Sequence, residues 1–387
     1  SKQESTNESK QESTGESKQE AADKNEQNAA VENKVLAEAP AAKAPVLMTA
    51  ALAPAPAAPT ATPTTPAEDN TVATITRQDG TTTTTTKYTS FDEAVSKAND
   101  GDTIEVIKDA TSTGIDLQNK KLTIKGTAQT VTTTTDSGTE EKTTVKPKLK
   151  FVAKDGQPQI FGITLRGSNL TFQNMDVDMT GASSTTYNNW NAVCMSGDAA
   201  LTLKSTDLFM NGKGLDERKD QEILKPHGIY MAGRGRNELN VDDHSTLTIN
   251  NYYNAIAWDG VGNKDSIYYI NIKDGSTFTA DGNEAGIVGL ESLDVLVEDS
   301  TMTITNCRAR YPDKTDNRVL PNEHEGRSGL NGADVTITRS NVTISGCEQG
   351  YGIHTRDLHV ENSTLTTDNN GYSSCLLYTS PSPRDLS

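Results

Sequence analysis

The chain is poor in the residues that mark several common protein classes. Its 387 residues include only four cysteines, too few for a scaffold built on disulfides. Aromatic residues make up only 5 % of the chain, so a local cluster of them stands out. Lys and Arg number 36 against 53 Asp and Glu, which gives a net charge of −17. This charge argues against a nucleic-acid partner, because binding phosphates requires a basic surface.

The chain also lacks a long apolar run. The apolar patch from Val46 to Leu52 is too short to cross a bilayer, and proline follows it closely, so we expect no membrane insertion. No basic and apolar signal sequence opens the chain. Since an initiator Met is missing as well, we expect residue 1 to be a mature end or a fragment end.

Residues 1–70 are predicted to form a disordered stalk. The first 24 residues repeat the polar phrase SKQE every eight residues without a large apolar side chain, and cannot bury enough surface to offset the entropy of ordering. Residues 39–66 consist mainly of Ala, Pro and Thr, a composition typical of an extended, semi-rigid spacer.

The rest of the chain carries an internal repeat. Each copy contains an apolar strand, a polar turn, a second strand and then an Asn or Gly, and a third short strand follows after a variable gap. Asn and Gly accept a left-handed backbone cheaply, as a sharp bend between strands requires. Successive copies begin at Leu201, Leu239, Ile270, Val295, Val335 and Leu358, and they reach this corner at Gly212, Asn251, Gly282, Asn306, Gly346 and Asn369.

Three short strands per copy predict an all-β parallel β-helix solenoid. Apolar and polar residues alternate in every strand, which puts one face inside and one in water. Ser90 and Glu93 form a capping box, so we expect an N-terminal capping helix within a cap spanning about residues 88–107. Thr-rich runs between Thr127 and Lys148 predict a protruding hairpin.

Cys307 and Cys347 occupy the same corner of successive copies. Stacked strands bring their Cα atoms within disulfide range, yet their side chains run parallel, which disulfide geometry disfavours. We therefore favour stacked free thiols over a disulfide.

The cap FDEAVSKANDGDTIEV, the strand KKLTIKG and coils of the form STLTI-x-N resemble right-handed parallel β-helix proteins of the pectin-lyase-like superfold, found in large surface proteins of Gram-positive gut bacteria. The resemblance implies a right-handed β-helix over residues 71–374, an extracellular, cell-surface or cell-wall location, and attachment through a missing C-terminal region. Residues 375–387, beginning CLLYTSPSPRD, resemble a translated sequencing adapter and are expected to be an artefact.

The insertions all fall between the corner and the third strand, so their loops are expected to line one edge as a groove. Aromatic and basic residues concentrate there, and they suit either packing of the loops or the binding of sugar faces and carboxylates. The long loop after Cys307 also reads as a solvated, salt-linked segment. The candidate ligand-binding residues are Tyr187, Trp190, Tyr252, Tyr253, Arg308, Arg310, Tyr311, His324, Arg327, Tyr351 and His354.

The favoured function is a non-catalytic adhesion or display module that binds a polysaccharide or a host or microbial surface glycan. The alternatives are a polysaccharide lyase or glycoside hydrolase of the same fold, and a structural spacer. Enzyme families of this fold suggest a calcium site or paired acids, but no motif here supports calcium, and no cofactor or other metal is predicted. The run Asp242-Asp243-His244 falls at a turn and is interpreted as turn chemistry, so the catalytic residues stay unknown.

Overall fold

The structure is a computed structural model of the chain. The chain divides into two compact units, residues 1–65 and 66–387, and all described residues lie in the second. The predicted stalk, apart from residues 69 and 70, therefore lies outside the described residues. The structure describes residues 69–134, 140–157, 159–182, 191–212, 226–258, 266–289, 292–307, 328–348, 350–371 and 375–377.

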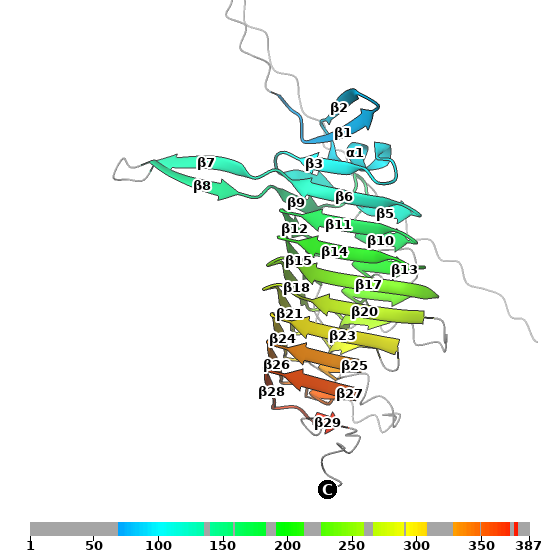
Figure 1. The fold of residues 1–387 in the computed structure, drawn as a ribbon, viewed down its shortest axis with the longest axis vertical. Coiled ribbons are helices and arrows are strands. Elements are labelled where there is room, and N and C mark those ends of the chain that lie inside the picture. Colours follow the sequence, from blue (N-terminus) through cyan, green and yellow to red (C-terminus); the bar gives the residue numbers. More distant parts are fainter. Residues whose placement is uncertain are drawn as a thin grey trace, which may run out of the picture. The chain divides into compact units, whose positions relative to one another are not determined.

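A hairpin and a short helix close the first end of the solenoid (Figure 1). Strands β1 (Ala73–Asp79) and β2 (Thr82–Tyr88) pair antiparallel, and helix α1 (Phe91–Lys97) follows. The helix begins as predicted, because the Ser90 side chain accepts a hydrogen bond from the Glu93 amide at 3.4 Å. The hairpin has no counterpart among the predicted elements, although an Asp-Gly turn between alternating strands is a typical hairpin signal.

Helix α1 plugs the apolar interior at this end. Phe91 and Ala94 are buried, whereas Val95, predicted to share the buried face, is only partly buried. The Asp102 carboxylate lies 2.6 Å from the Arg77 guanidinium and ties the cap to β1. This hydrogen-bonded ion pair holds the pKa of Asp102 below its ordinary value. Within the described ranges, no helix is long and apolar enough to span a membrane.

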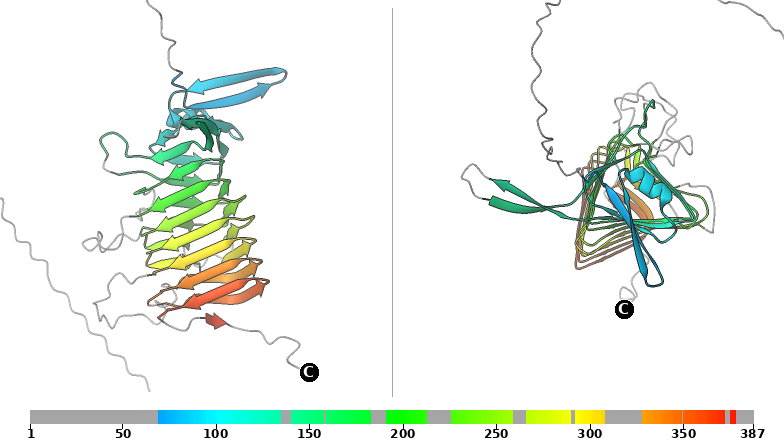
Figure 2. Two further views of the ribbon diagram at one scale, coloured as in Figure 1. Left: turned by 90° about the vertical axis from the view of Figure 1, so that its left-hand side faces the viewer. Right: turned by 90° about the horizontal axis from the view of Figure 1, so that it is seen from above.

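After the cap the chain winds into repeated coils of three strands each (Figures 1 and 2). The first strands begin with β3 (Thr103–Val106), and β6 (Lys121–Gly126), β11 (Asn169–Gln173), β14 (Ala200–Lys204), β17 (Gly235–Asp242), β20 (Ser266–Ile272) and β23 (Leu293–Glu298) follow. The third strands are β5 (Ile115–Gln118), β10 (Ile163–Arg166), β13 (Val193–Ser196), β16 (Ile229–Ala232), β19 (Asn254–Trp258) and β22 (Ala285–Val288). In later coils the third and first strands run together as β25 (Leu330–Thr338) and β27 (Ile353–Glu361).

The second strands form a parallel sheet of their own. In spatial order from the cap they are β4 (Ala110–Ser112), β9 (Lys148–Phe151), β12 (Asp176–Asp178), β15 (Asp207–Asn211), β18 (Thr246–Asn250), β21 (Thr277–Asp281), β24 (Thr301–Thr305), β26 (Asn341–Ser345) and β28 (Thr364–Asp368). Strand β4 is therefore the edge of this sheet at the capped end. The described part of the chain is an all-β, solenoid-like fold with long parallel sheets.

The strand register confirms the sequence alignment of the copies. In each of the three strand positions, the apolar residues predicted to be equivalent are hydrogen-bonding neighbours in the sheet. The aligned residues of the first strands are Leu201, Leu239, Ile270, Val295, Val335 and Leu358, and those of the third strands are Ile229, Ile256, Ile287, Leu330 and Ile353.

The predicted Asn or Gly corners form one column along the solenoid. At the first five corners, the amide of the corner residue donates to the carbonyl that precedes the corner of the next coil, as from Asn251 to Asp281 at 3.1 Å and from Asn306 to Ser345 at 3.1 Å. A left-handed backbone bends the chain at five of the six positions, with φ between 51° and 70°. These five are Asn251, Gly282, Asn306, Gly346 and Asn369.

A ladder of serine hydroxyls stabilises the turn before the second strand. In five successive coils a backbone amide donates to the serine hydroxyl of the next coil, at 2.9–3.2 Å. At the turn these amides have no partner in the sheet, and the serine hydroxyl accepts their hydrogen bond instead. This explains why Ser recurs in the STLTI phrase. The acceptors are Ser245, Ser276, Ser300, Ser340 and Ser363.

The cysteines of the solenoid are buried and reduced. Cys194, Cys307 and Cys347 are free thiols, so the prediction for Cys307 and Cys347 is confirmed. A hydrogen bond with Cys347, together with burial, raises the pKa of Cys307. Burial also raises the pKa of Cys194 to about 11. The thiols of Cys194 and Cys307 are therefore poor nucleophiles at neutral pH.

Two further predictions concern segments outside the regular coils. Strands β7 (Gln129–Thr134) and β8 (Glu140–Val145) form the predicted hairpin, which projects away from the coils (Figure 2). At the other end, β29 (Cys375–Leu377) pairs in parallel with β27. Residues 378–387 lie outside the described residues, so the adapter origin of the tail stays a prediction.

Candidate functional site

The outer face of the third strands carries the polar and aromatic cluster that lies closest to the loop insertions. We define the third-strand face as the outward side chains of these strands together with the residues that lead into them. Four candidate residues, Tyr252, Tyr253, Tyr351 and His354, lie at or beside this face. The other seven, Tyr187, Trp190, Arg308, Arg310, Tyr311, His324 and Arg327, lie outside the described residues.

Two pairs of stacked rings occupy equivalent positions on this face. His227 stacks on Tyr230 with ring centroids 5.3 Å apart and planes 10° apart. Tyr351 stacks on His354 with centroids 5.4 Å apart and planes 27° apart. The first pair belongs to the sequence His-Gly-Ile-Tyr and the second to Tyr-Gly-Ile-His. The two rings are three residues apart in both, and the order of histidine and tyrosine is reversed. Each pair arises because a glycine and an inward isoleucine separate two side chains that both lie outside the core.

The register places the two ring pairs at a defined separation. Tyr230, Ala257, Val288, Asn331 and His354 form one column of outward residues on successive strands. Four strand spacings separate Tyr230 from His354, which corresponds to about 19 Å at ~4.8 Å per spacing. The rings therefore mark two ends of an elongated surface that runs along the solenoid.

This face is more enclosed than an outer sheet face usually is. The outward residues Cys194, Ala257 and Asn331 are only 2 %, 4 % and 1 % exposed. Two polar residues that precede third strands, His227 and Glu284, are also buried. Buried polar groups are costly unless they are satisfied, so polar partners are required on this face.

The two adjacent tyrosines of this region have different roles. Tyr252 is 1 % exposed and belongs to the apolar core, and its amide donates to the Asn283 carboxamide at 2.8 Å. The packing interpretation therefore holds for Tyr252, which has no surface to offer a ligand. Tyr253 is only half-buried and meets the His227 ring edge-on at 5.6 Å. Both tyrosines lie in the bend that begins at Asn251, whose backbone is left-handed with a φ of 61°.

Two buried asparagines lie beside the candidate residues. Asn331 lies in the column between Tyr230 and His354, and Asn254 aligns with His227. The Asn254 side-chain oxygen is buried and accepts no hydrogen bond from a described residue. The sequence argument missed both because it searched for rings and charges. A search by position could have found them, because Asn254 lies two residues before the inward Ile256 and Asn331 lies one residue after the inward Leu330.

The acidic run Asp242-Asp243-His244 lies at a corner, as predicted. Asp243 and His244 have φ values of 54° and 59°, and the Asp243 carboxylate accepts a hydrogen bond from the Ser205 hydroxyl at 2.6 Å. This bond lowers the pKa of Asp243, whereas burial raises the pKa of Asp242. The run thus serves the turn, in agreement with the sequence interpretation.

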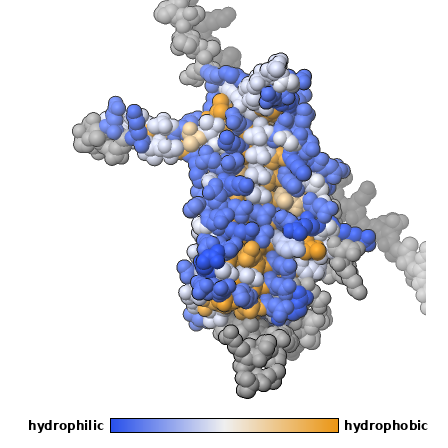
Figure 3. All heavy atoms as spheres, in the orientation of Figure 1, coloured by the Kyte–Doolittle hydropathy of each residue, from blue (hydrophilic) through white to orange (hydrophobic). Residues whose placement is uncertain are grey.

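A column of carboxylates lies on the outer face of the first strands. Asp294, Asp334 and Asp357 occupy equivalent positions on β23, β25 and β27. The Arg356 guanidinium lies 2.8 Å from Asp334 and 3.4 Å from Asp357. Within the described ranges, no group of three or more His, Cys, Asp or Glu side chains could hold a metal ion. The described residues therefore include no set of ligands for calcium. The face that carries these strands is mainly hydrophilic (Figure 3).

Replacing Asp294 with asparagine is expected to raise the free energy of unfolding by about 0.5 kcal/mol at pH 7. Burial and the neighbouring Asp334 carboxylate raise the pKa of Asp294. The folded protein therefore takes up a proton at this site before the unfolded chain does, and the wild type gains stability as the pH falls through the raised pKa. The advantage of the variant should shrink from pH 7 towards pH 4, as measured by urea unfolding at both values.

Asp116→Asn provides the control for this prediction, because Asp116 is exposed and lies 2.6 Å from Arg166. It should give no gain in stability at either pH. A gain that is the same at pH 7 and pH 4 for Asp294→Asn would contradict the repulsion argument.

Comparison with protein-family models, with curated proteins and with solved structures found no match.

Proposed function

We propose that the chain is a right-handed parallel β-helix of the pectin-lyase-like fold that serves as a non-catalytic binding module on a bacterial cell surface. The fold proposal is supported by coils of three short strands, parallel pairing throughout the coils and a helical cap at one end. In this proposal the module is secreted, attached to the cell wall, and binds an elongated glycan along the third-strand face.

The observation that carries the proposal is the pair of ring stacks at equivalent positions. Flat rings with polar atoms suit the faces of sugars. The distance between the stacks of about 19 Å, four strand spacings of ~4.8 Å, favours a chain-like ligand over a single sugar.

The proposal is tested by binding to a glycan array and to soluble polysaccharides. The double variants His227→Ala/Tyr230→Ala and Tyr351→Ala/His354→Ala should each lower the affinity at least about tenfold, since each removes two ring contacts. The matched control is Arg236→Ala/Tyr269→Ala, which removes a cation and a ring that lie 4.3 Å apart on another face. This control should bind as the wild type does.

Three results would decide against the proposal. Wild-type affinity in both ring variants would remove the third-strand face as the binding site. A comparable loss in the control variant would indicate a general loss of structure, which circular dichroism would detect. Release of unsaturated uronate products that absorb in the ultraviolet would instead support the lyase alternative.

A further inference from the structure

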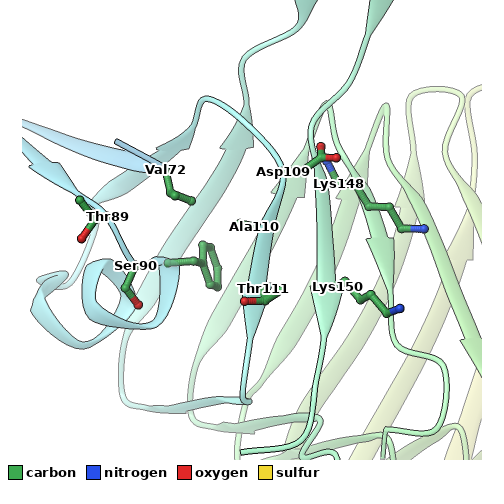
Figure 4. A pocket seen from close by; sticks show the side chains of 9 residues that line it. Val72, Thr89, Ser90, Asp109, Ala110, Thr111, Lys148 and Lys150 are labelled. Carbon is green, nitrogen blue, oxygen red and sulfur yellow. The ribbon is translucent and has the colours of Figure 1, made fainter. Parts of the chain in front are cut away.

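The first edge of the second-strand sheet is open and faces a cavity. Strand β4 ends this sheet, and its only strand partner among the described residues is β9. A cavity of about 470 Å³ lies between β4 and the cap (Figure 4). Its lining combines apolar side chains from the cap and β4, including Val72, Phe91 and Ala110, with polar groups of Ser90 and Thr111.

The backbone of Thr111 is directed at this cavity. The Ser112 carbonyl accepts a hydrogen bond from the Val152 amide, which follows β9, at 2.9 Å. In a parallel pair, alternate residues turn both backbone groups to the same side, so Ser112 and Ala110 face β9. The amide and carbonyl of Thr111 must then point away from β9 and towards the cavity. An unpaired amide and carbonyl on a strand edge form a template for one more strand.

The surroundings of this edge are basic, in contrast to the net charge of −17 of the whole chain. Lys148 and Lys150 line the cavity, and their side chains extend along the outer side of the sheet in Figure 4. An adjoining cavity of about 350 Å³ shares Asp109 with the first and is lined by Lys108 and Lys146. Four lysines and Asp109 line the two cavities, and Asp178 pairs with Lys148 at 3.2 Å, so these six side chains carry a formal charge of +2.

The adjoining cavity extends the apolar part of this surface. Its lining includes Val131 and Val145, which are 42 % and 45 % exposed and lie on the same face of the β7–β8 hairpin, together with Pro147. Exposed apolar side chains beside a free strand edge are typical of an interaction site. We call the two cavities together the cap groove.

We propose that the cap groove binds an extended acidic peptide segment of a partner protein, which adds to β4 as a further strand. A residue opposite Thr111 would point outward, where Lys150 is exposed. Its two neighbours would point inward, towards the apolar side chains of the cap. The pattern that fits is therefore an alternation of apolar and acidic residues. The inference is independent of the glycan-binding proposal, because the two sites share no residue.

The test uses the full chain and a blocked, fluorescent peptide in which valine and glutamate alternate over six residues. Binding is followed by fluorescence anisotropy. Thr111→Pro removes the open amide and leaves the hydrogen bonds between β4 and β9 in place, since proline is tolerated where the amide does not serve the sheet. It should weaken binding at least about tenfold, because the first hydrogen bond of the added strand is lost and the ring obstructs the edge.

Two matched variants separate the backbone from the charge. Thr111→Ala keeps the amide and should bind within about twofold of the wild type, since only an exposed side chain changes. Lys148→Gln/Lys150→Gln should weaken binding about threefold at low salt and less at high salt. In the wild type, addition of the peptide should slow hydrogen exchange of the Thr111 amide, a readout that does not depend on any variant.

Each other outcome would overturn the inference. Equal binding by Thr111→Pro and Thr111→Ala, with loss only in the lysine variant, would identify simple ion pairing. Polygalacturonate that competes fully with the peptide and is indifferent to Thr111→Pro would identify an anionic polysaccharide as the occupant. No binding of the peptide by the wild type would mean that the lysines protect the edge from strand addition.

Discussion

Replacing Gly286 with alanine is expected to lower the free energy of unfolding by about 3 kcal/mol, the upper end of the usual penalty for overpacking. A Cβ atom at Gly286 would lie 2.1 Å from the Gly329 carbonyl oxygen and 2.7 Å from a methyl group of Ile304. Neither neighbour can move aside easily. The Gly329 carbonyl accepts the Ile287 amide at 2.9 Å, and Ile304 is fully buried.

The position belongs to a column in which every coil has a small residue just before its third strand. Here the chain leaves the loop and packs directly against the inner side chains of the second strands, so that there is little room for a side chain. Two coils carry alanine at this position, and the others shown have glycine. The members with described contacts are Gly162, Ala192, Gly228, Ala255, Gly286 and Gly329.

The effect of Gly286→Ala is measured by urea unfolding followed by circular dichroism, and by hydrogen exchange along the solenoid. Because each coil contacts only its neighbours, faster exchange should be confined mainly to β19, β22 and β25. Gly332→Ala is the control, since its Cβ would stay 3.1 Å from the nearest atom, the Leu293 carbonyl oxygen. A loss of stability as large in the control would show that any added methyl group in β25 disturbs the solenoid, and the column argument would fail.

The register of the solenoid was open to prediction because it depends on local chemistry that repeats. Asn251 and Gly282 mark the same bend by their left-handed backbone, and the strands on either side alternate with a period of two residues. Once one bend is fixed, the inward positions follow. The free thiols at Cys307 and Cys347 follow in turn, because parallel side-chain directions disfavour a disulfide.

The candidate site was only partly open to prediction. The sequence places Tyr252 and Tyr253 together in one loop, but only the bend after Asn251 decides that Tyr252 enters the core. Burial on the third-strand face is likewise a property of the folded chain. Asn331 occupies a position that alternation assigns to water, yet it is 1 % exposed. The alternation of apolar and polar residues shows which side chains of a strand face the core. It does not show which segments pack against the outer side chains.

The edge of β4 illustrates a further limit. Ala110, Thr111 and Ser112 form a strand of three residues, too short to be distinguished from a loop by periodicity. The backbone of β4 is exposed because β4 is the end strand of the second-strand sheet, next to the cap. This position depends on the topology of the whole fold. A site built on backbone groups therefore has almost no signature in the sequence, whereas the ring pairs carry one in the phrases HGIY and YGIH.

Replacing Phe278 with alanine is expected to lower the free energy of unfolding by about 4 kcal/mol, within the usual range for a buried phenylalanine. Phe278 is 0 % exposed in β21, and its neighbours in the second-strand column are Leu247 and Met302. The cavity left by the ring would be lined by these two residues. Because the strands are held in register on both sides, the core can collapse into this space only in part, so the loss approaches the full value.

The chain offers a matched control in the same sheet. Phe209 lies in β15 at an outward position and is 40 % exposed, so Phe209→Ala should change stability by less than about 1 kcal/mol. Both variants are compared by urea unfolding under the same conditions. Equal losses would mean that Phe209 packs against a neighbour as closely as Phe278 does, or that the alternation of this sheet is reversed. A loss confined to Phe278→Ala would establish by experiment which face of the second strands builds the core, and hence which face is left to meet a partner.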